Sequence, residues 1–254
     1  LSALEYYYNG NHKSESIIES HENHNENICK IENLIKKLGK NYRTVTRKEL
    51  SEHLVNAYDF VISAGGDGTV IATAAFNKNI PQLNIKTDEK SKGKLCSHLN
   101  VEEAINSLIR ENYEIENWTR QDVILNGKLI GRALNETAIG EDMNFTKMTR
   151  YNLNFNHRED YNENSGLIIV TGTGSTGWPN AFKQFSRKSK SFIFRTILPC
   201  EGREIGRDNY FKIEYKGHEG KVALDTVEYE LPRDSILEVK VSQYPLRVII
   251  PKSK

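Results

Sequence analysis

The residues most suited to chemistry form a short glycine-rich stretch: Gly65, Gly66, Asp67, Gly68 and Thr69. An apolar run at residues 60–62 precedes this stretch and a helix-compatible segment at 69–77 follows it, so the sequence predicts a strand, a turn and a helix. Glycine backbones can approach a ligand closely, and backbone N–H groups at a helix N-terminus bind anions. A carboxylate beside bound phosphate is repelled unless it accepts a proton or holds a metal, and Asp67 is a candidate for either task. The alternative interpretation is a tight turn with a solvated aspartate.

Two further segments place polar side chains where strands usually carry packing residues. Asn135 and Glu136 lie side by side within an apolar strand predicted over 128–139. Adjacent strand residues point to opposite faces, so we expect one of the pair to reach a ligand and the other to brace a loop. The loop 171–178 follows an apolar strand at 167–170 and precedes a helical stretch. Its small hydroxyl residues offer many hydrogen-bonding groups and its tryptophan offers a flat face for a base, whereas a Ser/Thr/Gly linker is the alternative.

In this order the three segments resemble the NAD kinase family, whose members phosphorylate the 2′-hydroxyl of the adenosine ribose of NAD. The Gly-Gly-Asp-Gly-Thr turn matches the family's first motif in full, Asn135-Glu136 matches its Asn-Glu pair, and 171–178 matches its T-x-T-G-S-T-x-aromatic loop. Asp225 lies where the family has Asp-Gly, although Thr226 replaces the glycine. The first motif also occurs in lipid kinases and phosphofructokinases, whereas all three together are highly specific. The resemblance extends from about residue 26 to the C-terminus.

Finer detail resembles the mitochondrial-type branch of that family. The matching residues are Thr87, Asp88, Ser91, Gly93, Leu95 and Cys96. Ser165 stands where the common bacterial type has an aspartate before Gly-Leu, and Lys86 departs from the asparagine usual in both branches. Because that aspartate is missing, the contacts to the nicotinamide half of NAD are not assigned.

The resemblance implies a role for each motif. Gly65, Gly66, Gly68 and Thr69 would cradle the phosphates of the donor, and Asp67 would accept the proton of the ribose hydroxyl. The residues implied to bind NAD are Asn135, Glu136, Thr171, Thr173, Ser175, Thr176, Trp178 and Asp225. The expected cofactor is Mg²⁺ carried by ATP rather than by a metal site of the protein, with NAD as substrate. Phosphoryl transfer requires mainly positioning and charge neutralisation, which such a set supplies once Mg²⁺ is added.

Strands that alternate with helices over the first third of the chain predict the scaffold for the first motif. They indicate a parallel, Rossmann-like sheet, in which ligands bind at the carboxyl ends of strands, where Asp67 falls. Apolar spacing predicts a helix over 28–38 that ends at Gly39. The other expected elements are a strand at 42–46, a helix at 48–56, a strand at 80–85 and a helix at 101–112.

The second half of the chain predicts mostly antiparallel β-structure. Asn126-Gly127 is a strong hairpin signal. The expected strands span 115–125, 128–139, 151–157, 167–170, 209–216, 221–231, 236–242 and 246–250. The predicted fold is therefore an α/β N-terminal domain followed by a β-rich C-terminal domain. We place the domains at 1–98 and 99–254, with the last strand a candidate to return to the first domain.

Composition limits the compartment and the partners. The net charge of +1 favours neither a nucleic-acid nor a membrane partner, and no apolar run has the length of a membrane span. Cys29, Cys96 and Cys200 are odd in number and far apart, which is typical of a reducing compartment. We expect an intracellular protein, in the mitochondrial matrix if eukaryotic and in the cytoplasm otherwise, and a homodimer by analogy with the family. His21 and His24 lie three residues apart, but with no third ligand nearby they indicate a solvated helix start rather than a metal site.

Two alternatives stay open at this point. A lipid kinase of the diacylglycerol or sphingosine type would share the glycine-rich turn and a β-rich second domain, but it does not explain the loop 171–178. A relic that binds NAD without turnover is the second alternative, because Lys86, Ser165 and Thr226 all depart from the family pattern. An assay for NADP formation from NAD and Mg-ATP separates all three.

Overall fold

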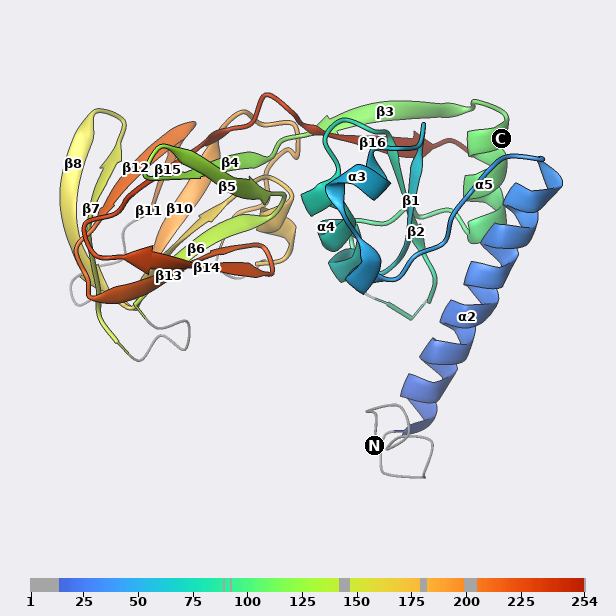
Figure 1. Cartoon of the computed structure of the whole chain (residues 1–254), viewed down its shortest axis with the longest axis horizontal. Helices are drawn as coiled ribbons and strands as arrows, with labels where there is room; N and C mark the ends of the chain where they lie inside the picture. The colour runs from blue at the N-terminus through green and yellow to red at the C-terminus, as the bar shows by residue number, and fades with distance from the viewer. Residues whose placement is uncertain are drawn as a thin grey trace. The chain divides into compact units, whose positions relative to one another are not determined.

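The computed structural model describes residues 14–88, 90–91, 93–141, 147–178, 182–198 and 205–253 (Figure 1). Cys200 lies outside these described residues. The chain divides into two compact units. Unit 1 contains the residues up to Phe76, the segment Ile80–Glu116 and the residues from Val248 onward. Unit 2 contains Asn77–Asn79 and Asn117–Arg247. An α/β unit and a mostly antiparallel β-unit are the fold class predicted from the sequence, and that prediction is confirmed.

Unit 1 is built on a four-stranded sheet in the order β1-β2-β16-β3. Its strands are β1 (Val61–Gly65), β2 (Gln82–Lys86), β16 (Leu246–Pro251) and β3 (Tyr113–Trp118). β1 and β16 both pair with β2 in parallel. The helices are α2 (Ser14–Lys37), α3 (Glu52–Val55), α4 (Asp67–Phe76) and α5 (Val101–Ile109), with a 3₁₀ turn η1 (Arg47–Glu49).

Side-chain alternation along β2 explains how the helices cover this sheet. Leu83 and Ile85 point to one face and lie in a buried cluster with Ile31 of α2 and Ile105 of α5. Gln82 points to the other face, where its amide donates to the carbonyl oxygen of Val70 in α4 at 3.3 Å. The strand is buried on both faces, as expected for a parallel sheet.

Four differences from the sequence prediction concern unit 1. Helix α2 begins at Ser14 rather than at 28, and Gly39 follows its end with a φ of +63°. The predicted strand at 42–46 is wrong, because Thr46 instead caps η1: its backbone N–H donates to the Glu49 carboxylate at 2.7 Å, and its carbonyl oxygen accepts the N–H of Glu49 at 3.0 Å. The helix predicted over 48–56 is only the short α3. Residue 98 was the expected end of the first domain, but α5 lies in the core of unit 1.

The described residues of unit 2 form two six-stranded sheets, ordered β11-β10-β9-β6-β13-β14 and β5-β4-β15-β12-β7-β8. Their bounds are β4 (Gln121–Leu125), β5 (Lys128–Ala133), β6 (Glu136–Gly140), β7 (Thr149–Phe155), β8 (Arg158–Asn164), β9 (Gly166–Val170), β10 (Phe192–Ile197), β11 (Ile205–Asp208), β12 (Tyr210–Tyr215), β13 (Glu219–Leu224), β14 (Val227–Pro232) and β15 (Ile236–Val241). Every pairing within them is antiparallel. Side chains from both sheets, such as Val123 and Phe192, share one buried core.

Polar groups interrupt three of the strands expected in unit 2. The strand predicted over 115–125 is β3 and β4, because Arg120 at the break is buried and donates to the carbonyl oxygens of Asn77, Lys78 and Tyr244 at 2.6 to 3.0 Å. The strands predicted over 128–139 and 221–231 are likewise two strands each. β8, β10 and β11 were not predicted.

The hairpin expected between β4 and β5 is confirmed. Asn126 and Gly127 both have positive φ, +49° and +79°, as a two-residue turn of this kind requires.

Candidate functional site

The glycine-rich turn joins β1 to α4 in unit 1. Helix α4 begins at Asp67, and the backbone N–H groups of Thr69 and Val70 donate to the carbonyl oxygen of Gly66 at 2.9 and 3.3 Å. A Cβ at Gly65 would collide with the Thr69 hydroxyl, so only glycine fits there. The first N–H groups of an α-helix lack partners within the helix, so this turn presents donors suited to an anion.

The Asp67 carboxylate is held in one orientation by the segment after β2. Its Oδ2 accepts a hydrogen bond from the backbone N–H of Lys94, and its Oδ1 accepts one from Leu95, both at 2.9 Å. Gly93 leaves room for this contact, since a Cβ there would lie 2.9 Å from the Asp67 Cγ. Each carboxylate oxygen retains a further lone pair, so the group can brace this loop and still accept a proton.

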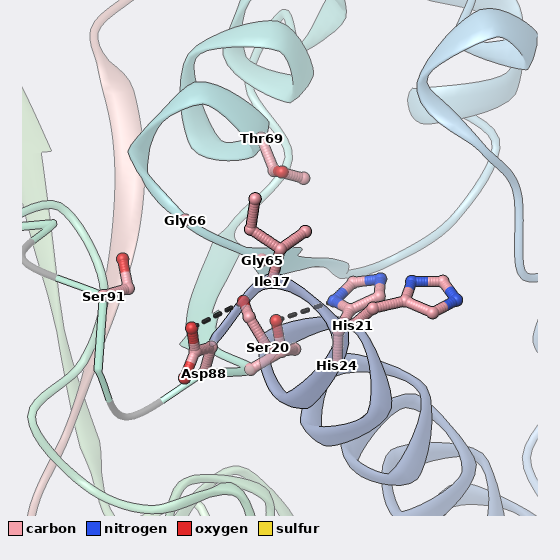
Figure 2. A pocket seen from close by; sticks show the side chains of 10 residues that line it. Ile17, Ser20, His21, His24, Gly65, Gly66, Thr69, Asp88 and Ser91 are labelled. Atoms are coloured by element: carbon pink, nitrogen blue, oxygen red, sulfur yellow. Dashed lines mark hydrogen bonds between the residues drawn. The ribbon is translucent and has the colours of Figure 1, made fainter. Parts of the chain in front are cut away.

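A pocket of about 560 Å³ opens beside the turn, and all of its lining residues belong to unit 1 (Figure 2). They are Ile17, Ser20, His21, His24, Gly65, Gly66, Thr69, Thr87, Asp88 and Ser91. Asp67 and Gly68 are not among them, and Gly68 is exposed. The structure therefore brings three of the four predicted phosphate-binding residues, but not the predicted base Asp67, to the lining of one pocket.

Helix α2 supplies a wall of this pocket that sequence reasoning missed. The Ser20 hydroxyl donates to Oδ2 of Asp88 at 2.7 Å, and Nδ1 of His24 lies 2.8 Å from the Thr87 hydroxyl (Figure 2). Asn27 donates to the Thr87 carbonyl oxygen at 2.9 Å. The interpretation of His24 as part of a solvated helix start is wrong, because the ring is partly buried against the segment after β2. The available signal was that Ser20, His24 and Asn27 share a helical face.

In unit 2 the loop after β9 packs against the break between β5 and β6. The Thr171 hydroxyl donates to the carbonyl oxygen of Leu134 at 2.6 Å. The backbone N–H of Thr171 donates to the carbonyl oxygen of Asn135 at 2.8 Å. Gly174 lies so close to Asn135 that a Cβ would be 2.7 Å from its carbonyl carbon. The interruption of the predicted strand therefore brings the Asn-Glu pair and the Thr-Gly loop together.

The hydroxyl residues of this loop divide into two kinds. Ser175 donates to the Gly172 carbonyl oxygen at 2.7 Å, and Thr176 donates to that of Thr173 at 2.9 Å, so both shape the turn η2 (Gly174–Thr176). The Thr173 hydroxyl is buried and has no hydrogen-bond partner among the described residues. It is thus the hydroxyl left to a ligand.

Three of the four buried side-chain atoms without a partner in the described structure belong to this cluster. They are Oδ1 of Asn135, Oε2 of Glu136 and the hydroxyl of Thr173, and the fourth is the hydroxyl of Ser63 in β1. An unsatisfied buried polar group costs about 1–3 kcal/mol. A cluster of three such groups is the signature of a site whose partners arrive with a polar ligand.

Burial, and then the nearby charge of Asp225, raise the pKa of Glu136 to about 7, while a hydrogen bond from the Trp178 side chain opposes them. Titration near neutrality allows Glu136 either to accept or to donate a hydrogen bond. A perturbed carboxyl beside unpaired polar atoms marks a functional site.

Asp225 lies in the turn between β13 and β14 with a φ of +53°. Its carboxylate accepts backbone N–H groups of Leu134, Asn135 and Glu136 at 2.8, 2.8 and 3.1 Å. Burial raises its pKa, while these N–H groups and Arg120 act in the opposite direction. Because its oxygens are occupied in this way, Asp225 positions the Asn-Glu pair, and a direct contact with NAD stays a prediction.

Trp178 is 46% exposed. Its side chain hydrogen-bonds to the carboxyl of Glu136, and its carbonyl oxygen accepts the N–H of Phe182 at 3.0 Å. An exposed indole tethered beside the unpaired polar cluster can offer its face to a base.

Two of the three departures from the family pattern, Lys86 and Ser165, have structural roles. Lys86 donates to the carbonyl oxygen of Ser91 at 2.9 Å, and so holds the wall of the unit 1 pocket. Ser165 is buried at the start of β9, where its N–H donates to Ile197 at 2.9 Å. Neither side chain forms a hydrogen bond with the unpaired atoms of Asn135, Glu136 and Thr173.

Two absences among the described residues bear on membrane and metal binding. Within them, no helix combines the length and the apolar character needed to cross a membrane. They contain no group of three or more His, Cys, Asp or Glu side chains able to hold a metal ion.

No protein-family model matches the chain. Among curated proteins, the NAD kinase of Picrophilus torridus is 27% identical over 220 residues, which cover 82% of this chain and 78% of that protein. The mitochondrial NAD kinase 2 of Xenopus tropicalis is 27% identical over 264 residues, and this match covers 80% of the chain but only 60% of the Xenopus protein.

Solved structures share the fold. An NAD kinase from Archaeoglobus fulgidus in complex with ATP has a TM-score of 0.70 at 22% identity, with 89% of this chain and 90% of that chain covered. A yeast NADH kinase complexed with NADH has a TM-score of 0.68 at 15% identity, with 83% of this chain and 67% of that chain covered.

Proposed function

We propose that this chain, which belongs to the NAD kinase family, transfers the terminal phosphoryl group of ATP to the 2′-hydroxyl of the adenosine ribose of NAD and so forms NADP. The observation that carries this proposal is the cluster of unpaired polar atoms on Asn135, Glu136 and Thr173. They occur on the two motifs that distinguish NAD kinases from other kinases with the same glycine-rich turn.

The unpaired atoms suit the hydroxyl groups of a nucleoside. A ribose hydroxyl can donate to Oδ1 of Asn135 or to the ionised carboxylate of Glu136, and it can exchange a hydrogen bond with Thr173 in either direction. Trp178 adds an exposed indole face on which adenine would stack. Thr171, Ser175 and Thr176 would act by holding the loop in shape.

The phosphoryl donor would bind in the pocket of unit 1. Gly65, Gly66 and Thr69 line it at the start of α4, where backbone N–H groups favour phosphate. Gly68 would contribute its backbone to the same helix turn.

The pocket also fits Mg²⁺ that arrives with the donor. Asp88 lies on the wall among the hydroxyls of Ser20, Thr87 and Ser91, and Mg²⁺ typically binds through one or two carboxylates together with substrate phosphates. When bound, Mg²⁺ neutralises charge on the transferred phosphoryl group.

Asp67 would act as the general base. It would accept the proton of the ribose hydroxyl as that oxygen forms a bond to the terminal phosphorus and the bond from phosphorus to the bridging oxygen of ADP breaks. The two backbone N–H groups that hold its carboxylate support this role because they fix its orientation.

Relatives support a location as well. Mitochondrial NAD kinase 2 proteins from Xenopus tropicalis and Homo sapiens are 27% and 26% identical to the chain. We propose the mitochondrial matrix for a eukaryotic source and the cytoplasm otherwise, with a homodimer as the assembled form. Light scattering on the purified protein would measure that assembly.

The decisive test is NADP formation by the purified protein from NAD and ATP, followed with an NADP-specific dehydrogenase. We expect turnover with Mg²⁺, loss of turnover when EDTA removes it, and no phosphorylation of diacylglycerol or sphingosine. Lipid phosphorylation without NADP would establish the lipid-kinase alternative. NAD binding without turnover would establish a non-catalytic relic.

A further inference from the structure

Helix α2 contributes two imidazole rings to the pocket beside the glycine-rich turn, and no motif assigns them a function. His21 and His24 line this pocket together with Gly65, Gly66 and Thr69 (Figure 2). A pocket that combines helix-start N–H groups, several hydroxyls and two imidazoles has the chemistry of a polyphosphate site.

We propose that His24, supported by His21, binds the terminal phosphates of the phosphoryl donor and takes up a proton when the donor binds. The inference rests on the proposed function only for the identity of the donor. The site itself consists of contacts within unit 1.

Thr87 orients the imidazole of His24. The threonine is buried, and its hydroxyl lies 2.8 Å from Nδ1 of the ring. When Nδ1 accepts that hydroxyl proton, Nε2 carries the ring proton and is a donor on a side chain that lines the pocket. Asn27 holds the Thr87 backbone through its carbonyl oxygen, so the orienting group is itself fixed.

The surroundings favour proton uptake on anion binding. Burial and the neighbouring His21 lower the pKa of His24, which favours the neutral ring at pH 7. A phosphate beside the ring would favour the protonated form, because opposite charge stabilises the imidazolium. Donor affinity should therefore increase as the pH falls toward 6.

Other charged groups near His24 are already engaged. Asp88 accepts hydrogen bonds from Ser20 and from the backbone N–H of Lys90, whose ammonium pairs with Glu19 of α2. Lys86 donates to the carbonyl oxygen of Ser91, and Asp67 accepts the backbone N–H groups of Lys94 and Leu95. His21 is within 3.0 Å of the Asn25 amide. His24 is the imidazole in this pocket that the buried Thr87 hydroxyl orients.

The probe is sodium tripolyphosphate, with calorimetric titration of the full chain at pH 6 and pH 8 in two buffers of different ionisation enthalpy. We expect His24→Gln to weaken binding at pH 6 about tenfold or more, as for loss of a charge-assisted hydrogen bond, and to abolish the additional proton uptake. His24→Lys should retain the affinity without that uptake. His53→Gln in α3, an exposed histidine outside the pocket, is the matched control and should behave as wild type.

The comparison between variants cancels the titration of the probe itself, and the thermal midpoint of each variant reports its folding. Equal affinity and equal proton uptake for His24→Gln and wild type would overturn the inference, as would the absence of any tripolyphosphate binding by wild type. Histidine-dependent binding in a protein that forms no NADP would refute the proposed function and leave this site in place. We also expect His24→Gln to raise the KM for Mg-ATP more than the KM for NAD.

Discussion

Replacing Glu136 with glutamine should stabilise the ligand-free protein and weaken its binding of NAD. The carboxyl is partly buried and one of its oxygens lacks a partner, while Asp225 adds a second negative charge. Glutamine keeps the shape of the side chain and removes the charge. Because the carboxyl is charged only above its pKa, the effect of the substitution on stability should depend on pH.

The structure gives the sign and the size. The pKa of Glu136 is raised from 4.5 to about 7 in the folded chain, so the stability that this group contributes is fully present below about pH 4.5 and is lost as the pH rises through 7. Each pKa unit corresponds to about 1.4 kcal/mol, so the penalty at pH 8 approaches about 3 kcal/mol. For a chain of this size that predicts a thermal midpoint several degrees higher for Glu136→Gln at pH 8, and little change at pH 5.

The assay is thermal unfolding of wild type and Glu136→Gln from pH 5 to pH 8, with Glu159→Gln on β8 as an exposed control. NAD binding is measured on the same samples. We expect the dissociation constant of the Glu136→Gln variant to rise about tenfold or more at pH 8, since a hydrogen bond to a charged acceptor is lost. A difference in midpoint that does not change between pH 5 and pH 8 would refute the argument from a buried carboxylate.

Two further predictions concern catalysis and stacking. Asp67→Asn should lower kcat by about 10²–10⁴-fold with little change in NAD affinity. It should also lower the thermal midpoint by several degrees, because the amide cannot accept both N–H groups of Lys94 and Leu95. Turnover within a few-fold of wild type would remove Asp67 from the mechanism. Trp178→Ala should weaken NAD binding about 5–150-fold, the equivalent of about 1–3 kcal/mol for base stacking, whereas Trp178→Phe should retain most of the affinity. If both variants bind NAD like wild type, adenine does not stack on Trp178.

Periodicity predicted the class of fold because it reports local burial. Leu83 and Ile85 in β2 lie in an apolar core, and the spacing of α5 matches its buried face. The alternation cannot reveal that Arg120 satisfies three carbonyl oxygens where β3 and β4 separate, because those partners are remote in sequence. For the same reason 115–125 looked like one strand.

Spacing identified the segments that carry the candidate site but not how α2 joins it. The residues of α2 that line the pocket meet Thr87 and Asp88, which are more than sixty positions away. A polar helical face has the same sequence signature whether it contacts solvent or a polar pocket. Only the tertiary placement of α2 distinguishes the two.

The pair of Asp225 and Glu136 shows why a motif match does not by itself define a ligand contact. Asp225 fixes the backbone of the Asn-Glu pair through three N–H groups, and the charge of the same carboxylate raises the pKa of Glu136. The group that builds the site thus also makes its neighbour costly to ionise when no ligand is present. A hydroxyl that donates to Glu136 would favour the ionised form, so part of the free energy of NAD binding would offset a penalty already present in the folded chain. NAD should therefore release protons on binding near pH 7, and it should stabilise wild type more at pH 8 than it stabilises Glu136→Gln.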